Sequence, residues 1–205
     1  MDAQLLAAAL ARFDQVNDAD PRRVPDPRLG AGQSEQIAVE TLYARRMSER
    51  LAAFEPDASV ALRLAVHAQH IARWRVPRES YPEGRAGYKR WRSELARTHA
   101  ELAGAILTEL GAAPDLVGRV RDLLQKKGLG RDPEAQALED VACLVFLEHH
   151  LADFAGKHER AKLIDILQKT WRKMSERGRA AALELALPDE LRALVVEALA
   201  PPAPR

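Results

Sequence analysis

The sequence contains a single cysteine, Cys143, and aromatic residues make up only 5% of its 205 residues. One cysteine permits neither a disulfide within the chain nor a cysteine-rich zinc site. The formal net charge is +1, from 31 Lys and Arg against 30 Asp and Glu. This balance argues against a protein whose whole surface attracts nucleic acid, although it allows a local basic patch.

Long apolar runs are also absent from the sequence. No stretch approaches the roughly 20 apolar residues that span a membrane. The N-terminal segment MDAQLLAAALARF has no basic region before its short apolar run. It is therefore expected to form an amphipathic helix rather than a signal peptide. We expect no membrane association and a cytoplasmic location, and the sequence indicates no oligomeric state.

What is present predicts an all-α fold. Ala, Leu, Arg and Glu dominate, and no segment alternates apolar and polar residues as a strand would. Breaks rich in Pro, Gly and Asp separate the helical segments, which predicts an irregular bundle of about eight helices. The predicted helices cover residues 2–16, 34–54, 59–75, 88–110, 114–128, 132–154, 158–174, 176–186 and 188–199.

The same breaks predict the domain organisation. Residues 1–34 should form an N-terminal helix and a loop, and residues 35–199 a single helical domain. Ser34 is a candidate N-cap for the first helix of that domain. The tail PPAPR and the residue before it, 200–205, are expected to be disordered.

Histidines interrupt two apolar stripes. In LAVHAQHIARW, residues 64–74, the apolar positions recur every three or four residues and His67 lies among them. His70 follows three residues later, on nearly the same side of a continuous helix. His99 lies in the same way between Leu95 and Leu102. All three imidazoles are therefore expected to point inward, either as hydrogen-bonded core residues or as ligands.

Two carboxylates and two lysines also fall on apolar segments. Glu139 and Asp140 lie in ALEDVACLVFL, which is apolar on almost every side and therefore predicts a buried helix. In the preceding helix an apolar stripe continues to Lys127, with Lys126 beside it. Buried ionisable groups are costly unless they are paired or bind a metal. Each carboxylate can also be explained as the partner of an arginine.

A basic and aromatic segment follows the two histidines. RWRVPRESYPEGRAGYKRWR, residues 73–92, contains six arginines interleaved with tyrosine and tryptophan. Arg85, Tyr88 and Arg92 are spaced by three and four residues, so a helix would place them on one face. Guanidinium groups suit phosphate or carboxylate. The segment is either an anion-binding lid or a solvated loop whose arginines pair with surface acids.

Four stretches resemble a known family. LAVHAQHIARW, YPEGRAGYKRWRSEL, LEDVACLVFLEHHLADF and ILQKTWRKMS are similar to domain of unknown function 4202, over about residues 35–198. That family carries no established activity. It is in turn similar to the HD superfamily, whose members are helical metal-dependent phosphohydrolases with some oxygenases.

The HD resemblance implies a site for a divalent metal, such as zinc, manganese or iron. LAVHAQHIARW resembles the helix that carries the His-Asp pair, and RTHAELAGAIL resembles a helix with a further histidine. In VRDLLQKKG lysine replaces the usual histidine, and LEDVACL resembles the last helix, with Asp140 as its aspartate. The implied metal ligands are His67, His70, His99 and Asp140.

The sequence departs from the HD pattern at two places. No aspartate follows His67 or His70. The first histidine is missing from residues 35–54, where Tyr43 or Arg46 stands in its place. The implied site therefore either binds one metal with fewer ligands or has become a metal-free pocket.

These observations lead to three hypotheses. The first is a metal-dependent hydrolase of a phosphorylated small molecule or nucleotide, with Glu139 as base or supporting carboxylate and Lys126 or Lys127 on the phosphate. Arg73, Arg85, Tyr88 and Arg92 would then contact the substrate. The second is a non-enzymatic module that binds RNA, a nucleotide or a protein through residues 73–92, although nucleic-acid binding is expected to be weak. The third is an iron-dependent oxygenase.

Overall fold

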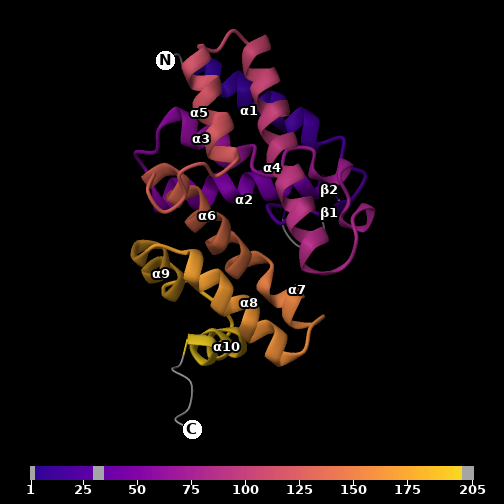
Figure 1. Cartoon of the computed structure of the whole chain (residues 1–205), viewed down its shortest axis with the longest axis vertical. Coiled ribbons are helices and arrows are strands. Elements are labelled where there is room, and N and C mark those ends of the chain that lie inside the picture. The colour runs from indigo at the N-terminus through magenta and orange to yellow at the C-terminus, as the bar shows by residue number, and fades with distance from the viewer. Residues whose placement is uncertain (1–2, 30–34, 200–205) are drawn as a thin grey trace. The chain divides into compact units, whose positions relative to one another are not determined.

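The computed structural model describes residues 3–29 and 35–199 (Figure 1). Within these residues the chain is all-α, as predicted, with ten α-helices, two short 3-10 helices and one two-stranded sheet. The tail 200–205 and the proposed cap Ser34 lie outside the described residues. None of the described helices has both the length and the apolar character needed to cross a membrane.

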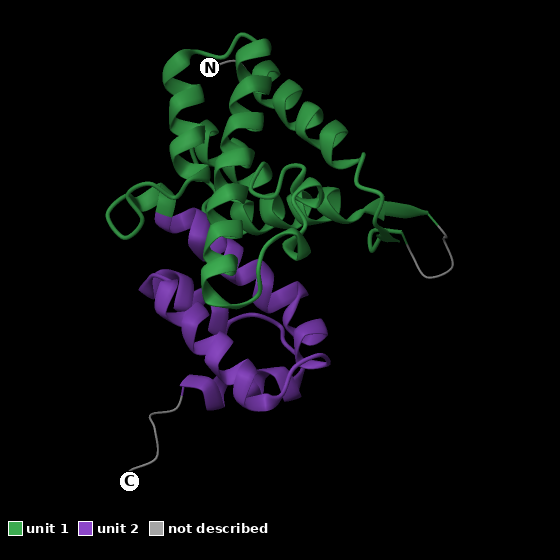
Figure 2. Cartoon of the chain, turned by 45° about the vertical axis from the view of Figure 1, so that its right-hand side comes forward, with its two compact units in different colours: residues 1–135 green, residues 136–205 purple. Residues whose placement is uncertain are grey.

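The contacts divide the chain into two compact units, residues 1–135 and 136–205 (Figure 2). This division differs from the predicted one after residue 34. The first helix, α1 (Ala3–Asn17), packs against α2, α3 and α4, so it belongs to unit 1. The other elements of unit 1 are β1 (Arg23–Pro25), β2 (Gln36–Ala38), α2 (Val39–Phe54), α3 (Val60–His67), η1 (Arg73–Arg75), η2 (Arg78–Ser80), α4 (Gly84–Glu109), α5 (Pro114–Leu124) and the start of α6 (Pro133–His149).

The core of unit 1 lies where these helices meet. α4 packs along α5, α5 packs on α3, and α3 packs on both α1 and α2. Large apolar side chains from each of them are completely enclosed: Phe13, Met47, Leu62, Leu64, Leu107 and Leu123. Burial of side chains of this size contributes about 1.5–3 kcal/mol each, so these contacts hold the helices that carry the candidate site.

The small sheet corrects the expectation that the chain has no strand. β1 and β2 pair antiparallel, with Val24 opposite Ile37. Each strand has only three residues, too few for an alternating pattern to show in the sequence. Because Gln36–Ala38 form β2, α2 begins at Val39 rather than at residue 34.

A second correction concerns the histidine helix, which ends at His67 instead of running to residue 75. Ala72 adopts a left-handed conformation with φ 52°, which an L residue takes only at a cost. Its amide donates to the Asn17 side-chain oxygen of α1 at 3.0 Å. This tertiary hydrogen bond offsets the cost of the left-handed conformation. His70 therefore lies in a turn and Arg73 begins the 3-10 helix η1, so neither lies on the stripe of α3.

Unit 2 contains most of α6 together with α7 (Leu151–Ala155), α8 (Arg160–Lys173), α9 (Glu176–Leu183) and α10 (Asp189–Leu199). The predicted helix 132–154 is thus two helices, because the chain leaves helical geometry at His150. α7 and α10 both pack on α8. Ser175 caps α9 by accepting a hydrogen bond from the Gly178 amide.

Gly87 allows the loop before α4 to pack directly on that helix. A Cβ atom there would lie 1.8 Å from the carbonyl oxygen of Pro82, whereas one at Gly118 in α5 would meet nothing within 4 Å. We expect Gly87→Ala to lower the free energy of unfolding by about 1–3 kcal/mol, the usual cost of overpacking. Gly118→Ala should raise it by about 0.5–1 kcal/mol. Urea denaturation of both variants checks this, and equal effects of the same sign would contradict it.

Candidate functional site

A half-buried histidine, His70, and a buried one, His99, lie together with charged residues from three segments of unit 1. The rings of His70 and His99 are 6.1 Å apart between centroids, and Tyr43 stacks on His70 at 3.9 Å. α2 supplies Tyr43, the turn after α3 supplies His70, and α4 supplies His99. We call this group the His70–His99 cluster, and its members are Glu40, Tyr43, His70, Arg73, Arg92 and His99.

The hydrogen bonds of His70 define its protonation. Arg73 Nη1 lies 2.8 Å from His70 Nε2, and arginine can only donate, so Nε2 accepts. The ring proton is then on Nδ1, which faces Glu40 Oε2 at 3.6 Å. Burial lowers the pKa of His70 well below its ordinary value, and the charges of Arg73 and Arg92 lower it further. His70 is therefore a neutral imidazole.

His99 contributes an unsatisfied polar atom to the cluster. Its side chain is 4% exposed, and Nε2 has no hydrogen-bond partner among the described residues. The main chain of Gln69 is hydrogen-bonded to the ring, but burial lowers the pKa of His99 to about 3, helped by the charges of Arg73 and Arg92. A buried ring nitrogen without a partner costs about 1–3 kcal/mol. This atom is the clearest candidate to meet a bound ligand.

Positive charge dominates the surroundings of the two rings. The Arg73 guanidinium lies over the Trp91 ring at 4.7 Å, and burial together with Arg92 lowers the pKa of Arg73. Glu40 is the carboxylate of the cluster. Its pKa is raised by burial, and Arg22 already binds it at 2.6 Å. One shared carboxylate therefore faces several cations.

A surface hollow adjoins the cluster through Arg92. It has a volume of about 480 Å³ and lies between α4 and the turn after α5, and its lining residues are Arg92, Ser93, Ala96, Arg97, Gln125 and Lys126. Lys126 stands in the left-handed region with φ 55°, and its charge acts on His70. Arg97 is paired with Glu94 and Glu101. We call this feature the Arg92–Lys126 hollow.

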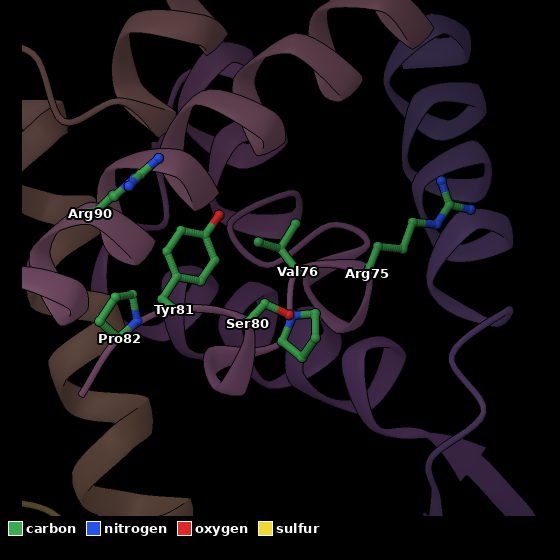
Figure 3. A pocket seen from close by; sticks show the side chains of 7 residues that line it. Arg75, Val76, Ser80, Tyr81, Pro82 and Arg90 are labelled. Atoms are coloured by element: carbon green, nitrogen blue, oxygen red, sulfur yellow. The ribbon is translucent and has the colours of Figure 1, made fainter.

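A second hollow, of about 410 Å³, is built entirely from residues 75–90 (Figure 3). It lies in the basic and aromatic segment that the sequence marked as a lid or loop. Arg85 and Tyr88 do not line it. Both are exposed, and Tyr88 leans on Trp91 with ring centroids 5.8 Å apart. Of the predicted substrate residues, the structure thus groups Arg73 and Arg92 in the His70–His99 cluster.

His67 has a different environment from that of His70. Its Nδ1 lies 2.9 Å from Ser48 Oγ, and its Nε2 lies 3.0 Å from Asp14 Oδ1. Both ring nitrogens are therefore occupied by residues of α2 and α1. His67 is a hydrogen-bonded core histidine that connects three helices, one of the two roles that its position allowed.

Asp140 belongs to unit 2, where both of its carboxylate oxygens also have hydrogen-bond donors. It accepts hydrogen bonds from the Ser175 amide at 2.8 Å, from Ser175 Oγ at 2.5 Å and from the Gln136 side chain at 3.1 Å. Glu139, the predicted base, lies in the same unit with its Oε1 3.7 Å from Lys173 Nζ. The turn between α8 and α9 thus depends on Asp140.

These environments decide how well the residues fit a divalent metal. No three His, Cys, Asp or Glu side chains gather as a possible metal site among residues 3–29 and 35–199. The polar atoms of His67 and Asp140 already have partners, and the cluster around His70 and His99 is rich in cations. The set of ligands implied by the HD resemblance does not fit a metal. Lys127, the other predicted phosphate residue, is exposed and paired with Asp122 at 2.7 Å.

Comparison with known proteins gives one match. Residues 7–195 match the model of the family described as Domain of unknown function (DUF4202). The chain belongs to this family. The match confirms the resemblance seen in the sequence and extends it to most of α1. Neither a curated protein nor a solved structure matches this DUF4202 chain, so no comparison shows the relationship to HD proteins.

The lowered pKa values of the two histidines predict an effect of pH on stability. Their pKa in the fold lies below the ordinary 6.5, so the unfolded chain binds more protons at acidic pH. Stability should be complete above about pH 6.5 and fall as the pH drops towards 3, by up to about 1.4 kcal/mol per pH unit for each histidine.

Denaturation at pH 7, 6 and 5 checks this expectation. His99→Gln should make the loss of stability with falling pH less steep. His158→Gln serves as the control, because that histidine is exposed in unit 2, and should leave the slope unchanged. A free energy of unfolding that stays constant over this range would show that the fold does not hold the two rings neutral.

The contacts of Asp140 predict that it stabilises unit 2 without any metal. Asp140→Ala leaves the Ser175 amide and hydroxyl without their acceptor, so we expect a loss of about 2–4 kcal/mol for two or more hydrogen bonds to a charged group. The measurement is thermal denaturation in the presence of EDTA. An aspartate that served as a metal ligand alone would give wild-type stability under these conditions.

Proposed function

We propose that this DUF4202 chain binds a phosphorylated small molecule at the His70–His99 cluster and the adjoining Arg92–Lys126 hollow. The observation that carries the proposal is the excess of positive charge around the neutral imidazoles of His70 and His99. Arg73, Arg92 and Lys126 all act on His70, while Glu40 is shared with Arg22. An anion bound here would offset the excess positive charge that the described residues place around His70.

Phosphate suits this arrangement better than a metal cation does. Guanidinium groups donate in a fork that matches phosphate oxygens, and such charge-assisted hydrogen bonds are strong. His99 Nε2, without a partner in the described part of the chain, is an acceptor in the neutral ring and would take a hydrogen bond from a hydroxyl group of the same ligand. A divalent cation would instead be repelled by Arg73 and Arg92.

The hydrolase hypothesis adds a reaction to this binding site. The HD relationship is supported by the positions of His70 and His99, which come from the two segments that the resemblance assigns to its histidines and lie 6.1 Å apart. Metal-dependent hydrolysis and iron-dependent oxygenation both need a ligand set that these residues do not form. We therefore propose phosphate binding as the function. Hydrolysis of the bound phosphate ester is a separate question that a direct assay would answer.

Ligand binding is tested by calorimetric titration of the full chain with pyrophosphate and with adenosine 5′-monophosphate. Arg92→Ala removes a cation common to the cluster and the hollow, so it should weaken binding by about 1.5–3 kcal/mol, roughly tenfold to a hundredfold. Lys126→Ala should act in the same direction. Arg63→Ala is the matched control, because Arg63 is exposed on α3 and, among the described residues, bonds only the Pro56 carbonyl. Equal affinity in all three variants would rule the site out.

Metal content decides between binding and metal-dependent catalysis. We expect elemental analysis to find well under one equivalent of zinc, manganese or iron per chain, even after incubation with each ion. Release of phosphate from the bound monophosphate should then not depend on EDTA. One equivalent of metal that is lost in His99→Ala, but kept in His158→Ala, would instead restore the hydrolase hypothesis.

A further inference from the structure

The hollow built from residues 75–90 is a separate, preformed feature of unit 1. Arg78 holds its loop by donating to the carbonyl oxygens of Tyr81 at 2.8 Å and Pro82 at 2.9 Å. The Trp91 indole donates to the Val76 carbonyl at 2.8 Å. Gly87 lets Pro82 rest on α4. Because these contacts fix the walls, little freedom would be lost when a ligand enters.

The lining of this hollow is cationic at two separate points. Figure 3 shows Arg75 and Arg90 on opposite sides of the view, with Tyr81 and Val76 between them. The lining residues include no carboxylate; they are Arg75, Val76, Pro77, Ser80, Tyr81, Pro82 and Arg90. The hollow therefore combines two positive ends, two hydroxyl groups and an apolar middle.

Neither arginine is neutralised by the described part of the chain. The Arg75 guanidinium lies over the Trp74 ring at 5.1 Å and makes no ion pair with residues 3–29 or 35–199. The Arg90 guanidinium makes neither an ion pair nor a hydrogen bond within the same residues. Some arginines elsewhere in the chain are paired, such as Arg22 with Glu40 and Arg119 with Glu134. The two unpaired charges thus coincide with the hollow.

We propose that this hollow binds a small organic dianion, with one carboxylate on Arg75, the other on Arg90 and a short apolar spacer over Val76 and Tyr81. A volume of about 410 Å³ falls in the range of small-molecule sites. The site shares no lining residue with the Arg92–Lys126 hollow. It is therefore independent of the proposed phosphate site.

The experiment uses the ¹⁵N-labelled full chain and its three tryptophans. The Trp91 indole bonds the carbonyl of Val76, a lining residue, and Trp74 lies beneath Arg75, whereas Trp171 belongs to unit 2 and is the internal control. Succinate, glutarate and adipate are titrated at constant ionic strength, with acetate as the monoanion. We expect at least one dicarboxylate to shift the Trp91 indole signal saturably, at a concentration about tenfold or more below that of acetate.

Variants then assign the effect to the two arginines. Arg75→Gln and Arg90→Gln should each raise the dissociation constant about tenfold, while Arg63→Gln and Arg92→Ala should leave it unchanged. Both lining arginines are exposed, so the variants should fold, and an unmoved Trp171 signal checks this. The proposal is overturned if no dicarboxylate shifts Trp91, if acetate binds as well, or if the arginine variants bind normally. Tighter binding of a single-stranded RNA oligonucleotide at the same residues would also overturn it.

Discussion

The hydrogen bond between the Ala72 amide and the Asn17 side chain is the constraint on which the candidate site depends. It gives the Ala72 amide a hydrogen-bond acceptor at the point beyond α3 where the chain adopts φ 52°. The turn brings His70 beside Tyr43 of α2 and His99 of α4. A helix continuing through residue 75 would instead have kept His70 on the flank of α3. One contact from the N-terminal helix thus decides which side chains can meet.

The electrostatics of the cluster follow from this turn. Arg73 is half-buried against Trp91 and His70, where a guanidinium is costly unless an anion is near. Glu40 is partly shared with Arg22, and burial raises its pKa, so it compensates Arg73 incompletely. Burial and the nearby positive charges lower the pKa of both imidazoles, so both are neutral. The described residues of the cluster therefore carry more positive than negative charge, and Glu40 is the one carboxylate among its members.

The sequence predicted the fold class and most helices, because long segments with helical periodicity need little tertiary information. It did not predict the end of α3 at His67, since the Asn17 side chain that stabilises the turn lies 55 residues away in the chain. The apolar stripe around His67 correctly indicated burial. It could not show that Ser48 and Asp14 occupy both ring nitrogens.

The same distinction, between what helical spacing predicts and what distant contacts decide, applies to the candidate residues. His99 and Arg92 were found because their positions on α4 follow from helical spacing alone. Glu40 was missed as a member of the cluster, because an acidic residue in the first turn of a helix is also explained by the helix dipole. Asp140 was correctly placed as buried, but its partners come from Gln136 and from Ser175, the cap of another helix. Periodicity reports which side of a helix is enclosed and not which atoms enclose it.

The contacts of Asp140 show how the protein itself stabilises a buried carboxylate. A buried carboxylate needs hydrogen-bond donors whether or not a metal is present. In unit 2 the amide and hydroxyl of Ser175 supply them, and the Gly178 position leaves the space, since a Cβ there would lie 2.6 Å from the Asp140 carboxylate. In unit 1, arginines supply positive charge beside His70 and His99. The Asp140 carboxylate thus has its hydrogen-bond donors within unit 2, whereas His99 Nε2 in unit 1 is left without a partner among the described residues.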